Sequence, residues 1–329
     1  MINLDRAAQT SVFPGIENVI IESLRLHRAS EFGLGKVTDS LLDEKVSSIA
    51  SMLRFYSDQL SFFNSASAAV AFLSSVVKDK LYCHVLEHKN TRAVANMVEL
   101  SSVEFLAEDD YFVVSLRNNE TGQELNESEM QILKNAKCKL VFDITGFDFE
   151  SELLDMADIV FASSGKWHSM SGVGLFASRI ELAERADRFS GYALGTPNLT
   201  GILSLEAAMR WMKKTKFRQE MTEEYVELFS QMATDLGWIT HGIGKSICSF
   251  NVGVNGRAFC YECSELGLTI STGAACSSGS PENPVIRHLF GQKASEQTIR
   301  ISWDRMTKKD DVLSAIEIMR RVDAKFKGM

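Results

Sequence analysis

Short runs of apolar residues alternate with amphipathic stretches along the first two hundred residues of the chain. Runs that are apolar at almost every position are typical of strands covered on both faces of a sheet. The predicted strands are residues 60–63, 81–86, 112–116, 140–142 and 159–162. Helical spacing of apolar residues predicts helices at 14–24, 41–53, 66–77 and 91–98. This alternation predicts an α/β fold built on a mainly parallel sheet flanked by helices.

The pattern changes from residue 203 onward. Two long helical patterns lead into a strand, and after a further α-β stretch an amphipathic helix closes the chain. The predicted elements are helices at 203–214, 220–236 and 309–326 and a strand at 247–252. This part of the sequence therefore predicts a second, smaller α+β domain.

Composition and charge narrow the class of protein. Of the 329 residues 45% are apolar and 24% are charged, which excludes a disordered or low-complexity chain. The net charge is −8 and there is no long basic run, so nucleic acid is not an expected partner. No apolar run approaches the roughly 18 residues of a membrane-spanning helix. The first ten residues include Asp5 and Arg6 and lack the apolar core of a signal peptide, so a cytoplasmic protein is expected.

The cysteine pattern does not indicate a disulfide scaffold in a chain of this length. The six cysteines are Cys83, Cys138, Cys248, Cys260, Cys263 and Cys276. Cys260 and Cys263 form a C-x-x-C pair, but a zinc site needs a second such pair or two suitably spaced histidines. We therefore expect no metal and a reduced enzyme with buried thiols.

Two polar residues follow predicted strands and are candidates for chemistry. Lys166 lies in a Ser-Ser-Gly-Lys-Trp-His segment directly after the strand at 159–162. A lysine in a partly buried turn can act as a Schiff-base nucleophile, whereas the alternative is a solvated loop lysine. Asp143 ends the strand at 140–142, at the edge where open α/β sheets bind ligands. It can pair with a protonated heterocyclic nitrogen or simply cap the following turn.

Two further segments have the composition of binding or reactive loops. Residues 271–280 are almost all small and contain Cys276, which indicates an exposed loop with either a reactive thiol or an incidental small residue. Residues 64–69 join a strand to a helix and carry serines. Their backbone N–H groups and hydroxyls can cradle a phosphate, although serine-rich helix starts are common without one.

Taken in order, these segments resemble the NifS-like cysteine desulfurases of the class V aminotransferase superfamily of pyridoxal phosphate (PLP) enzymes. The segment from Cys276 to Arg300 is similar to that group rather than to the short-loop SufS-like group. The similar segments are residues 2–10, 87–89 (Glu-His-Lys), 118–122 (Asn-Asn-Glu-Thr-Gly), 195–196 (Gly-Thr) and 273–276 (Gly-Ala-Ala-Cys). The resemblance implies the PLP-dependent transferase fold type I. It implies a large PLP-binding domain over 13–202 with a seven-stranded-type sheet, and a small domain formed by 1–12 and 203–329.

The resemblance also implies a role for individual residues. Lys166 falls at the Schiff-base lysine, Asp143 at the aspartate that pairs with the pyridine nitrogen, and His88 at the histidine stacked on the ring. Arg300 falls at the arginine that binds the substrate carboxylate, and Cys276 at the cysteine that accepts sulfur as a persulfide. The remaining implied contacts to cofactor or substrate come from Asn119, Ser67, Ala68, Ser163 and, across a homodimer interface, Thr196.

Several positions depart from the family pattern. Gly165 stands where the family has His, Gly146 where it has Gln, and Leu194 where it has Arg. Ala68 stands at a usual Thr, for which Ser67 can substitute, and Arg6 replaces an Asn. These changes remove hydrogen bonds to the cofactor, and each charge-assisted bond contributes about 1.5–3 kcal/mol if nothing replaces it.

The function expected from the sequence is removal of sulfur from L-cysteine, giving L-alanine and a persulfide for an acceptor protein that the sequence does not identify. Destinations for the sulfur include iron–sulfur assembly. Two alternatives stay open: another class V enzyme, such as an aminotransferase or a cysteine or selenocysteine lyase, and a non-catalytic homologue. Cys276 distinguishes a desulfurase from an aminotransferase, because a desulfurase needs this thiol and an aminotransferase does not.

Overall fold

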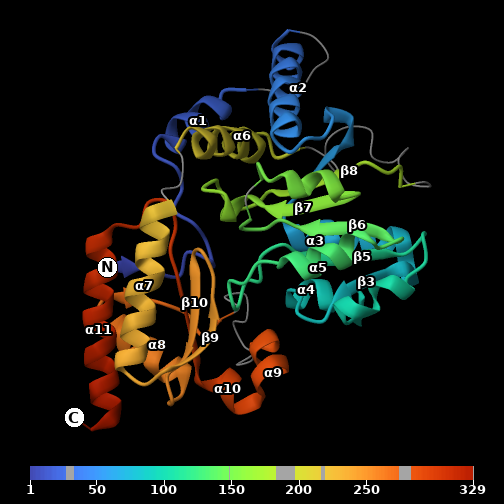
Figure 1. The fold of residues 1–329 in the computed structure, drawn as a ribbon. Helices are drawn as coiled ribbons and strands as arrows, with labels where there is room; N and C mark the ends of the chain where they lie inside the picture. The colour runs from blue at the N-terminus through green and yellow to red at the C-terminus, as the bar shows by residue number, and fades with distance from the viewer. Residues whose placement is uncertain (27–32, 148, 183–196, 216–218, 274–282, 329) are drawn as a thin grey trace. The chain divides into compact units, whose positions relative to one another are not determined.

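The computed structural model describes residues 1–26, 33–147, 149–182, 197–215, 219–273 and 283–328. The chain divides into two compact units. Unit 1 consists of 1–11, 117–124 and 217–329, and unit 2 consists of 12–116 and 125–216. Figure 1 shows the elements of both units in chain order.

Unit 2 is built on a seven-stranded sheet, counted over the described residues, in the order β2-β8-β7-β6-β5-β3-β4. The strands from β7 to β4 run parallel, and β8 is antiparallel to both of its neighbours. The strands are β2 (Leu60–Phe63), β3 (Leu81–His84), β4 (Asn96–Val98), β5 (Tyr111–Ser115), β6 (Lys139–Asp143), β7 (Ile159–Ser163) and β8 (Gly174–Ser178). The mainly parallel sheet expected from the apolar runs is confirmed.

Helices cover this sheet, and α1 and α6 lie side by side (Figure 1). The helices of unit 2 are α1 (Ile16–Ser23), α2 (Leu34–Met52), α3 (Ala66–Val77), α4 (Lys89–Arg92), α5 (Glu127–Lys134) and α6 (Leu199–Lys214). Capping residues in the local sequence define where several of these helices begin. Ser65 caps α3, and Asn126 and Glu129 form a reciprocal capping box at the start of α5.

The helix predicted at 91–98 is wrong. Residues 89–92 form the four-residue helix α4, and residues 96–98 form β4, which pairs in parallel with β3 at the sheet edge. The backbone N–H and C=O groups of these residues are satisfied by β3, so pairing with a neighbouring strand overrides the local helical spacing.

Unit 1 contains a three-stranded antiparallel sheet in the order β12-β10-β9 and a parallel pair formed by β1 and β11. Figure 1 shows α7, α8 and α11 together on one side of the larger of these two sheets. The strands are β1 (Ile2–Asn3), β9 (Ile239–Ile243), β10 (Ile247–Asn251), β11 (Leu268–Thr269) and β12 (Thr298–Ser302). The helices are α7 (Gln219–Asp235), α8 (Gly256–Glu265), α9 (Pro284–Phe290), α10 (Gln292–Gln297) and α11 (Lys309–Lys327).

The observed units differ from the predicted domain limits at three places, of which the boundary predicted after residue 12 moves by a single residue, to 11. Helix α6 crosses the predicted limit at residue 202 and lies wholly in unit 2, because Ile202, Leu205 and Met209 are buried in the core of that unit. The segment 117–124 lies in unit 1, where the Ser249 hydroxyl donates to the main-chain oxygen of Glu120. The N-terminal segment belongs to unit 1, which joins residues from the two ends of the chain.

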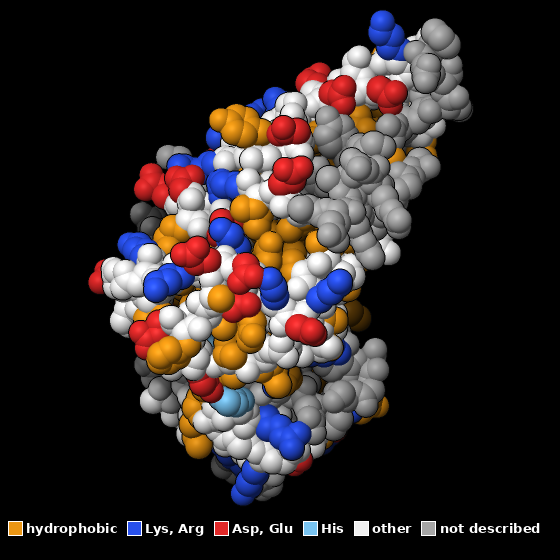
Figure 2. All heavy atoms as spheres, turned by 90° about the vertical axis from the view of Figure 1, so that its right-hand side faces the viewer, with side chains coloured by type: hydrophobic (Ala, Val, Ile, Leu, Met, Phe, Trp, Pro, Cys, Tyr) orange, Lys and Arg blue, Asp and Glu red, His pale blue; other side chains and the backbone are white. Residues whose placement is uncertain are grey.

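Charged groups of both signs are interspersed among the described residues on the face shown in Figure 2, and these residues form no extended surface of a single sign there. Such mixing does not favour a polyanion as a partner of this face. Among the helices that the structure describes, none combines the length and the apolar character needed to span a bilayer.

Candidate active site

Lys166 lies in a tight turn between two buried strands of unit 2. β7 ends at Ser163, residues 164–166 form one turn of 3₁₀ helix, and β8 begins at Gly174. The Ser164 hydroxyl closes this connection by donating to the carbonyl of Met170 (2.5 Å) and accepting from the N–H of Val173 (3.3 Å). Hydrogen bonds within the connection therefore hold it as a defined turn rather than a solvated loop.

Trp167 anchors the chain immediately after Lys166. Its side chain is 1% exposed, its indole N–H donates to the carbonyl of Phe147 (3.2 Å), and its ring packs against Phe149. A large buried ring next to Lys166 holds the backbone of the turn in place, which is what a reactive lysine requires.

Asp143 and His88 lie within the electrostatic influence of Lys166. Burial raises the pKa of Asp143, and the positive charge of Lys166 acts in the opposite direction. Burial also lowers the pKa of His88 to about 4, with further lowering by the charges of Lys89 and Lys166. Unit 2 thus brings together the lysine, the aspartate and the histidine that the sequence singles out, with His88 neutral at physiological pH.

The carboxylate of Asp143 lies at the carboxyl end of β6. One of its oxygens accepts the N–H of Thr145 (2.8 Å), and the side chain is 8% exposed. Burial of a carboxylate is costly, and a positively charged partner offsets that cost, so a second cation beside Asp143 would add to the effect of Lys166. This position therefore suits a protonated ring nitrogen.

The start of α3 and the start of α4 are tied together by side chains. The Asn90 amide donates to the Ser67 hydroxyl (2.6 Å), and the His88 ring nitrogen Nδ1 accepts the N–H of Asn90 (3.2 Å). Ser65 accepts the N–H of Ala68 (3.1 Å). A helix start of this kind, with main-chain N–H groups and two serine hydroxyls, suits a phosphate.

Gly174 of β8 contacts the beginning of α3 more closely than any other residue type could. A Cβ atom at Gly174 would lie 2.1 Å from the carbonyl oxygen of Ser65. The glycine that follows the Lys166 connection therefore sets the position of the helix start on which Ser67 lies.

Glu87 belongs to this cluster, although its position in the sequence does not by itself indicate a role. The carboxyl group is 1% exposed, and its two oxygens accept from the N–H and the hydroxyl of Ser115. Ser115 is the cross-strand neighbour of Asp143 on β5 and β6. Burial, reinforced by the charge of Asp143, raises the pKa of Glu87 to about 8. The signal available in the sequence was an acidic residue directly before His88, at the end of a buried strand.

The raised pKa of Glu87 predicts a pH-dependent stability. Between its ordinary value of 4.5 and about 8, the unfolded chain releases this proton and the folded chain keeps it. Stability is therefore expected to fall as the pH rises through this window, by up to about 1.4 kcal/mol per pH unit, and the Glu87 contribution should level off above it. Urea unfolding of wild type and of Glu87→Gln across the window measures the effect. In the variant, the free energy of unfolding should no longer fall with pH through this window. A fall as steep as that of wild type would contradict the assignment to Glu87.

Two of the departures from the family pattern have a local structural cause. Gly146 has φ +76°, a left-handed conformation that a glutamine rarely adopts. A side chain at Gly165 would begin 2.7 Å from the Ser171 hydroxyl, so the histidine of the family does not fit unless Ser171 moves. The turns after Asp143 and before Lys166 are thus built around glycine in this chain.

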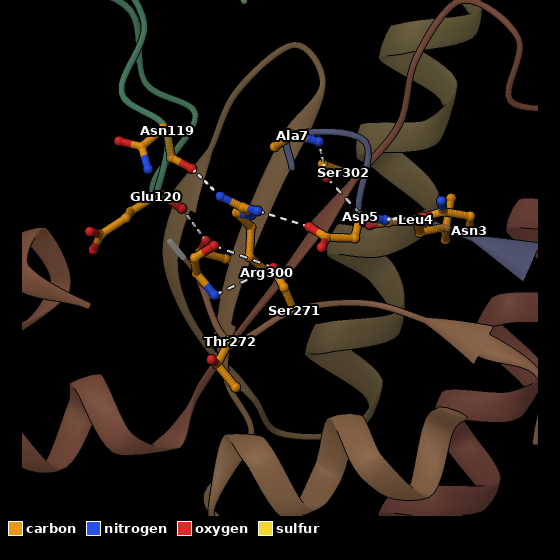
Figure 3. A network of polar contacts seen from close by, with 12 residues as sticks. Asn3, Leu4, Asp5, Ala7, Asn119, Glu120, Ser271, Thr272, Arg300 and Ser302 are labelled. Atoms are coloured by element: carbon orange, nitrogen blue, oxygen red, sulfur yellow. Dashed lines mark hydrogen bonds and ion pairs between the residues drawn. The ribbon is translucent and has the colours of Figure 1, made fainter. Parts of the chain in front are cut away.

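Arg300 lies on β12 of unit 1 and is 1% exposed (Figure 3). Its Nη1 donates to the main-chain oxygen of Asn119 (2.7 Å), and its Nη2 pairs with the carboxylate of Asp5 (2.8 Å). Unit 1 therefore brings together Arg300 and Asn119, two residues that the sequence singled out, and adds Asp5. Asn119 contacts the arginine through its backbone.

Three of the predicted residues, Cys276, Thr196 and Leu194, lie outside the described residues. The other five cysteines are free thiols. Burial raises the pKa of Cys83, Cys248 and Cys263 to about 12, raises that of Cys138 to about 11, and raises that of Cys260 as well. All five are therefore protonated and poorly nucleophilic at neutral pH.

The sequence matches one family model, described as "Aminotransferase class-V", over residues 84–314. No curated protein sequence is significantly similar to the chain. The matched range contains His88, Asp143, Lys166, Cys276 and Arg300.

Solved structures similar to this chain cover almost all of it. A NifS-like protein is 18% identical, with 100% of both chains covered and a TM-score of 0.80. A NifS-like protein from Rickettsia africae is 17% identical, with coverage of 98% and 99% and a TM-score of 0.80. The apo form of a cysteine desulfurase from Thermococcus onnurineus is 17% identical, with coverage of 100% and 95% and a TM-score of 0.78. These likenesses confirm the fold expected from the sequence.

Proposed function

Because this chain belongs to the class V aminotransferase family, we propose that it is a PLP-dependent cysteine desulfurase, which removes sulfur from L-cysteine and forms L-alanine. The observation that carries the proposal is the cluster of Lys166, Asp143 and His88 in unit 2, in which the charge of the lysine acts on the other two groups. The Gly-Ala-Ala-Cys segment that ends at Cys276 supports sulfur transfer as the reaction.

The residues present fit PLP, the cofactor of this family. Asp143 offers a buried carboxylate for the protonated pyridine nitrogen, and Lys166 offers the amine for the aldehyde. The start of α3, with Ser67 and the N–H groups around it, suits the phosphate. Ser163 ends β7 directly before the lysine turn and is proposed as a further contact. When bound, the cofactor supplies an electron sink for bonds that break at the substrate carbon atoms.

The side chains of the chain itself would divide the remaining tasks. Asp143 would hold a proton on the ring nitrogen, and His88, which is neutral, would lie against the cofactor and could accept a proton. The Lys166 amine would hold the cofactor and could move protons at the substrate carbon atoms. Arg300 binds the substrate carboxylate, because a guanidinium binds a carboxylate through paired N–H groups.

Cys276 is the proposed sulfur acceptor. Its thiolate attacks the sulfur of the substrate, a sulfur–sulfur bond forms, and the carbon–sulfur bond of the substrate breaks with the electron pair going to carbon. That carbon then takes a proton, which gives alanine, and Cys276 keeps the sulfur as a persulfide. The raised pKa values of the described thiols support this choice by excluding them as thiolates at neutral pH.

The setting proposed for this reaction follows the resemblance. We expect a homodimer in which Thr196 contacts the phosphate of the partner subunit's cofactor, a cytoplasmic location, and delivery of sulfur to an acceptor protein, for example in iron–sulfur assembly. Analytical ultracentrifugation of the purified protein tests whether it is a dimer in solution.

The function is tested with purified protein, PLP, L-cysteine and a thiol reductant, by measuring alanine, sulfide and pyruvate. We expect alanine and sulfide in equal amounts and no pyruvate. Pyruvate in place of alanine would indicate a lyase, and transfer of the amino group to an added 2-oxo acid would indicate an aminotransferase. L-Selenocysteine is added as a competing substrate, and a preference for it over L-cysteine would indicate a selenocysteine lyase. No product from any of them would contradict an enzymatic role.

A further inference from the structure

The carboxylate of Asp5 is paired with the guanidinium of Arg300, 295 residues away in the sequence (Figure 3). The two partners are joined by an Nη2–Oδ1 distance of 2.8 Å, and the arginine is 1% exposed. A buried guanidinium needs an acidic or carbonyl partner, because an unpaired buried charge is strongly destabilising. Asp5 supplies the acidic partner of this pair.

The N-terminal segment brings Asp5 to this position. Asp5 forms a parallel bridge with Ser302, which lies two residues after Arg300 on β12. The main-chain N–H of Ser302 donates to the carbonyl of Leu4 (2.7 Å), and the Ser302 hydroxyl accepts the N–H of Ala7 (2.8 Å). Asp5 therefore lies alongside β12 on a backbone held on both sides of it.

The guanidinium is held at two of its three nitrogens. Nη1 donates to the main-chain oxygen of Asn119, and Nη2 donates to Asp5. Nε is buried, and the residues that the structure describes offer it no hydrogen-bond acceptor. An unsatisfied buried N–H is unfavourable. A new hydrogen bond from Nε of Arg300 to an incoming acceptor is therefore more stabilising than one at a nitrogen that already has a partner.

We propose that Asp5 is a positioning residue for carboxylate recognition: together with the main-chain oxygen of Asn119, it orients Arg300 so that its Nε edge receives the α-carboxylate of the substrate. The inference rests on the proposed function and deepens it, because it assigns a role in substrate binding to the N-terminal segment. Asp5 acts through Arg300 and contacts no reacting atom.

The test compares Asp5→Ala, which removes the acceptor, with Asp5→Asn, which keeps an oxygen at the same place. Asp5→Ala is expected to raise the KM for L-cysteine by about tenfold or more, because one charge-assisted bond that orients the guanidinium is lost, and to change kcat by less than about threefold. Asp5→Asn is expected to restore KM to within about threefold of wild type. Asp235→Ala, which breaks the ion pair with Arg320 in the same unit, is the matched control and should leave KM unchanged.

A binding measurement without turnover makes this test independent of catalysis. 3-Mercaptopropionate carries the thiol and carboxylate of the substrate but no amine, and 2-mercaptoethanol lacks the carboxylate. By isothermal titration calorimetry, Asp5→Ala should weaken binding of the first by about tenfold and leave the second unchanged. Circular dichroism confirms that each variant is folded. If Asp5→Ala is not, Asp5→Ser, whose shorter side chain does not reach Nη2 of Arg300, replaces it with the same expected loss.

The outcomes separate this inference from the proposed function. Unchanged or tighter binding of 3-mercaptopropionate by Asp5→Ala would overturn the positioning role, as would an equal loss in Asp5→Ala and Asp5→Asn or a loss of kcat with KM unchanged. If wild type forms no alanine from cysteine, the proposed function fails. The calorimetric comparison would then still support or overturn the role of Asp5 toward Arg300.

Discussion

Replacement of Lys166 by alanine is expected to lower alanine formation by at least about a thousandfold, because covalent attachment of the cofactor and proton transfer by the amine are lost together. The fold should survive. The turn is held by Ser164, which closes it, and by Trp167, which is buried against Phe149. None of these contacts uses the lysine side chain.

Two companion variants show which property of Lys166 matters. Lys166→Arg keeps a positive charge near Asp143 and His88 but has no nucleophilic amine, so it should be as inactive as the alanine variant. Lys139→Ala removes a lysine at the opposite end of β6 from Asp143 and should retain activity. The measurements are alanine release and the absorbance of the lysine-bound cofactor. Retention of alanine formation by Lys166→Ala would contradict the assignment.

Replacement of Cys276 by alanine is expected to abolish alanine formation from L-cysteine while leaving the cofactor absorbance as in wild type. The physical reason is that the described thiols are protonated at neutral pH, so none of them can replace a lost thiolate. The measurement is alanine release, together with mass spectrometry of the Cys276 peptide after a single turnover in the absence of reductant. That peptide should gain one sulfur atom in wild type.

The matched control for this experiment is Cys260→Ala. Cys260 is only partly buried, and burial raises the pKa of its thiol, so its removal should leave alanine formation unchanged. Equal alanine release from wild type and from Cys276→Ala would remove Cys276 from the mechanism and favour a lyase. Loss of activity in Cys260→Ala but not in Cys276→Ala would move the role of sulfur acceptor to α8.

The central sheet could be predicted from the sequence because its signal is local. Strands covered on both faces must be apolar at nearly every position, so β5, β6 and β7 stand out without knowledge of their neighbours. The same reasoning applies to Asp143 and Lys166. Each follows a buried strand, and the carboxyl ends of parallel strands form one edge of the sheet. The location of this part of the candidate site was therefore encoded in the order of elements along the chain.

The helix wrongly predicted at 91–98 shows the limit of local pattern. Its apolar spacing fits a helix, yet residues 96–98 pair with β3 as an edge strand. The partner strand ends twelve residues earlier, and whether an edge is available to it depends on how the whole sheet is assembled. Local periodicity carries no information about that edge.

What the sequence determined by itself is the fold class, the sheet and the candidates for the residues that carry the chemistry, because these depend on residue type and on order along the chain. What only the tertiary structure decided is how distant residues modify one another. Asp5 pairs with Arg300 because the N-terminal segment lies beside β12, and Glu87 keeps a proton because it is buried near Asp143. Pairing and burial are properties of the folded chain, since they depend on distances in space that residue order does not specify.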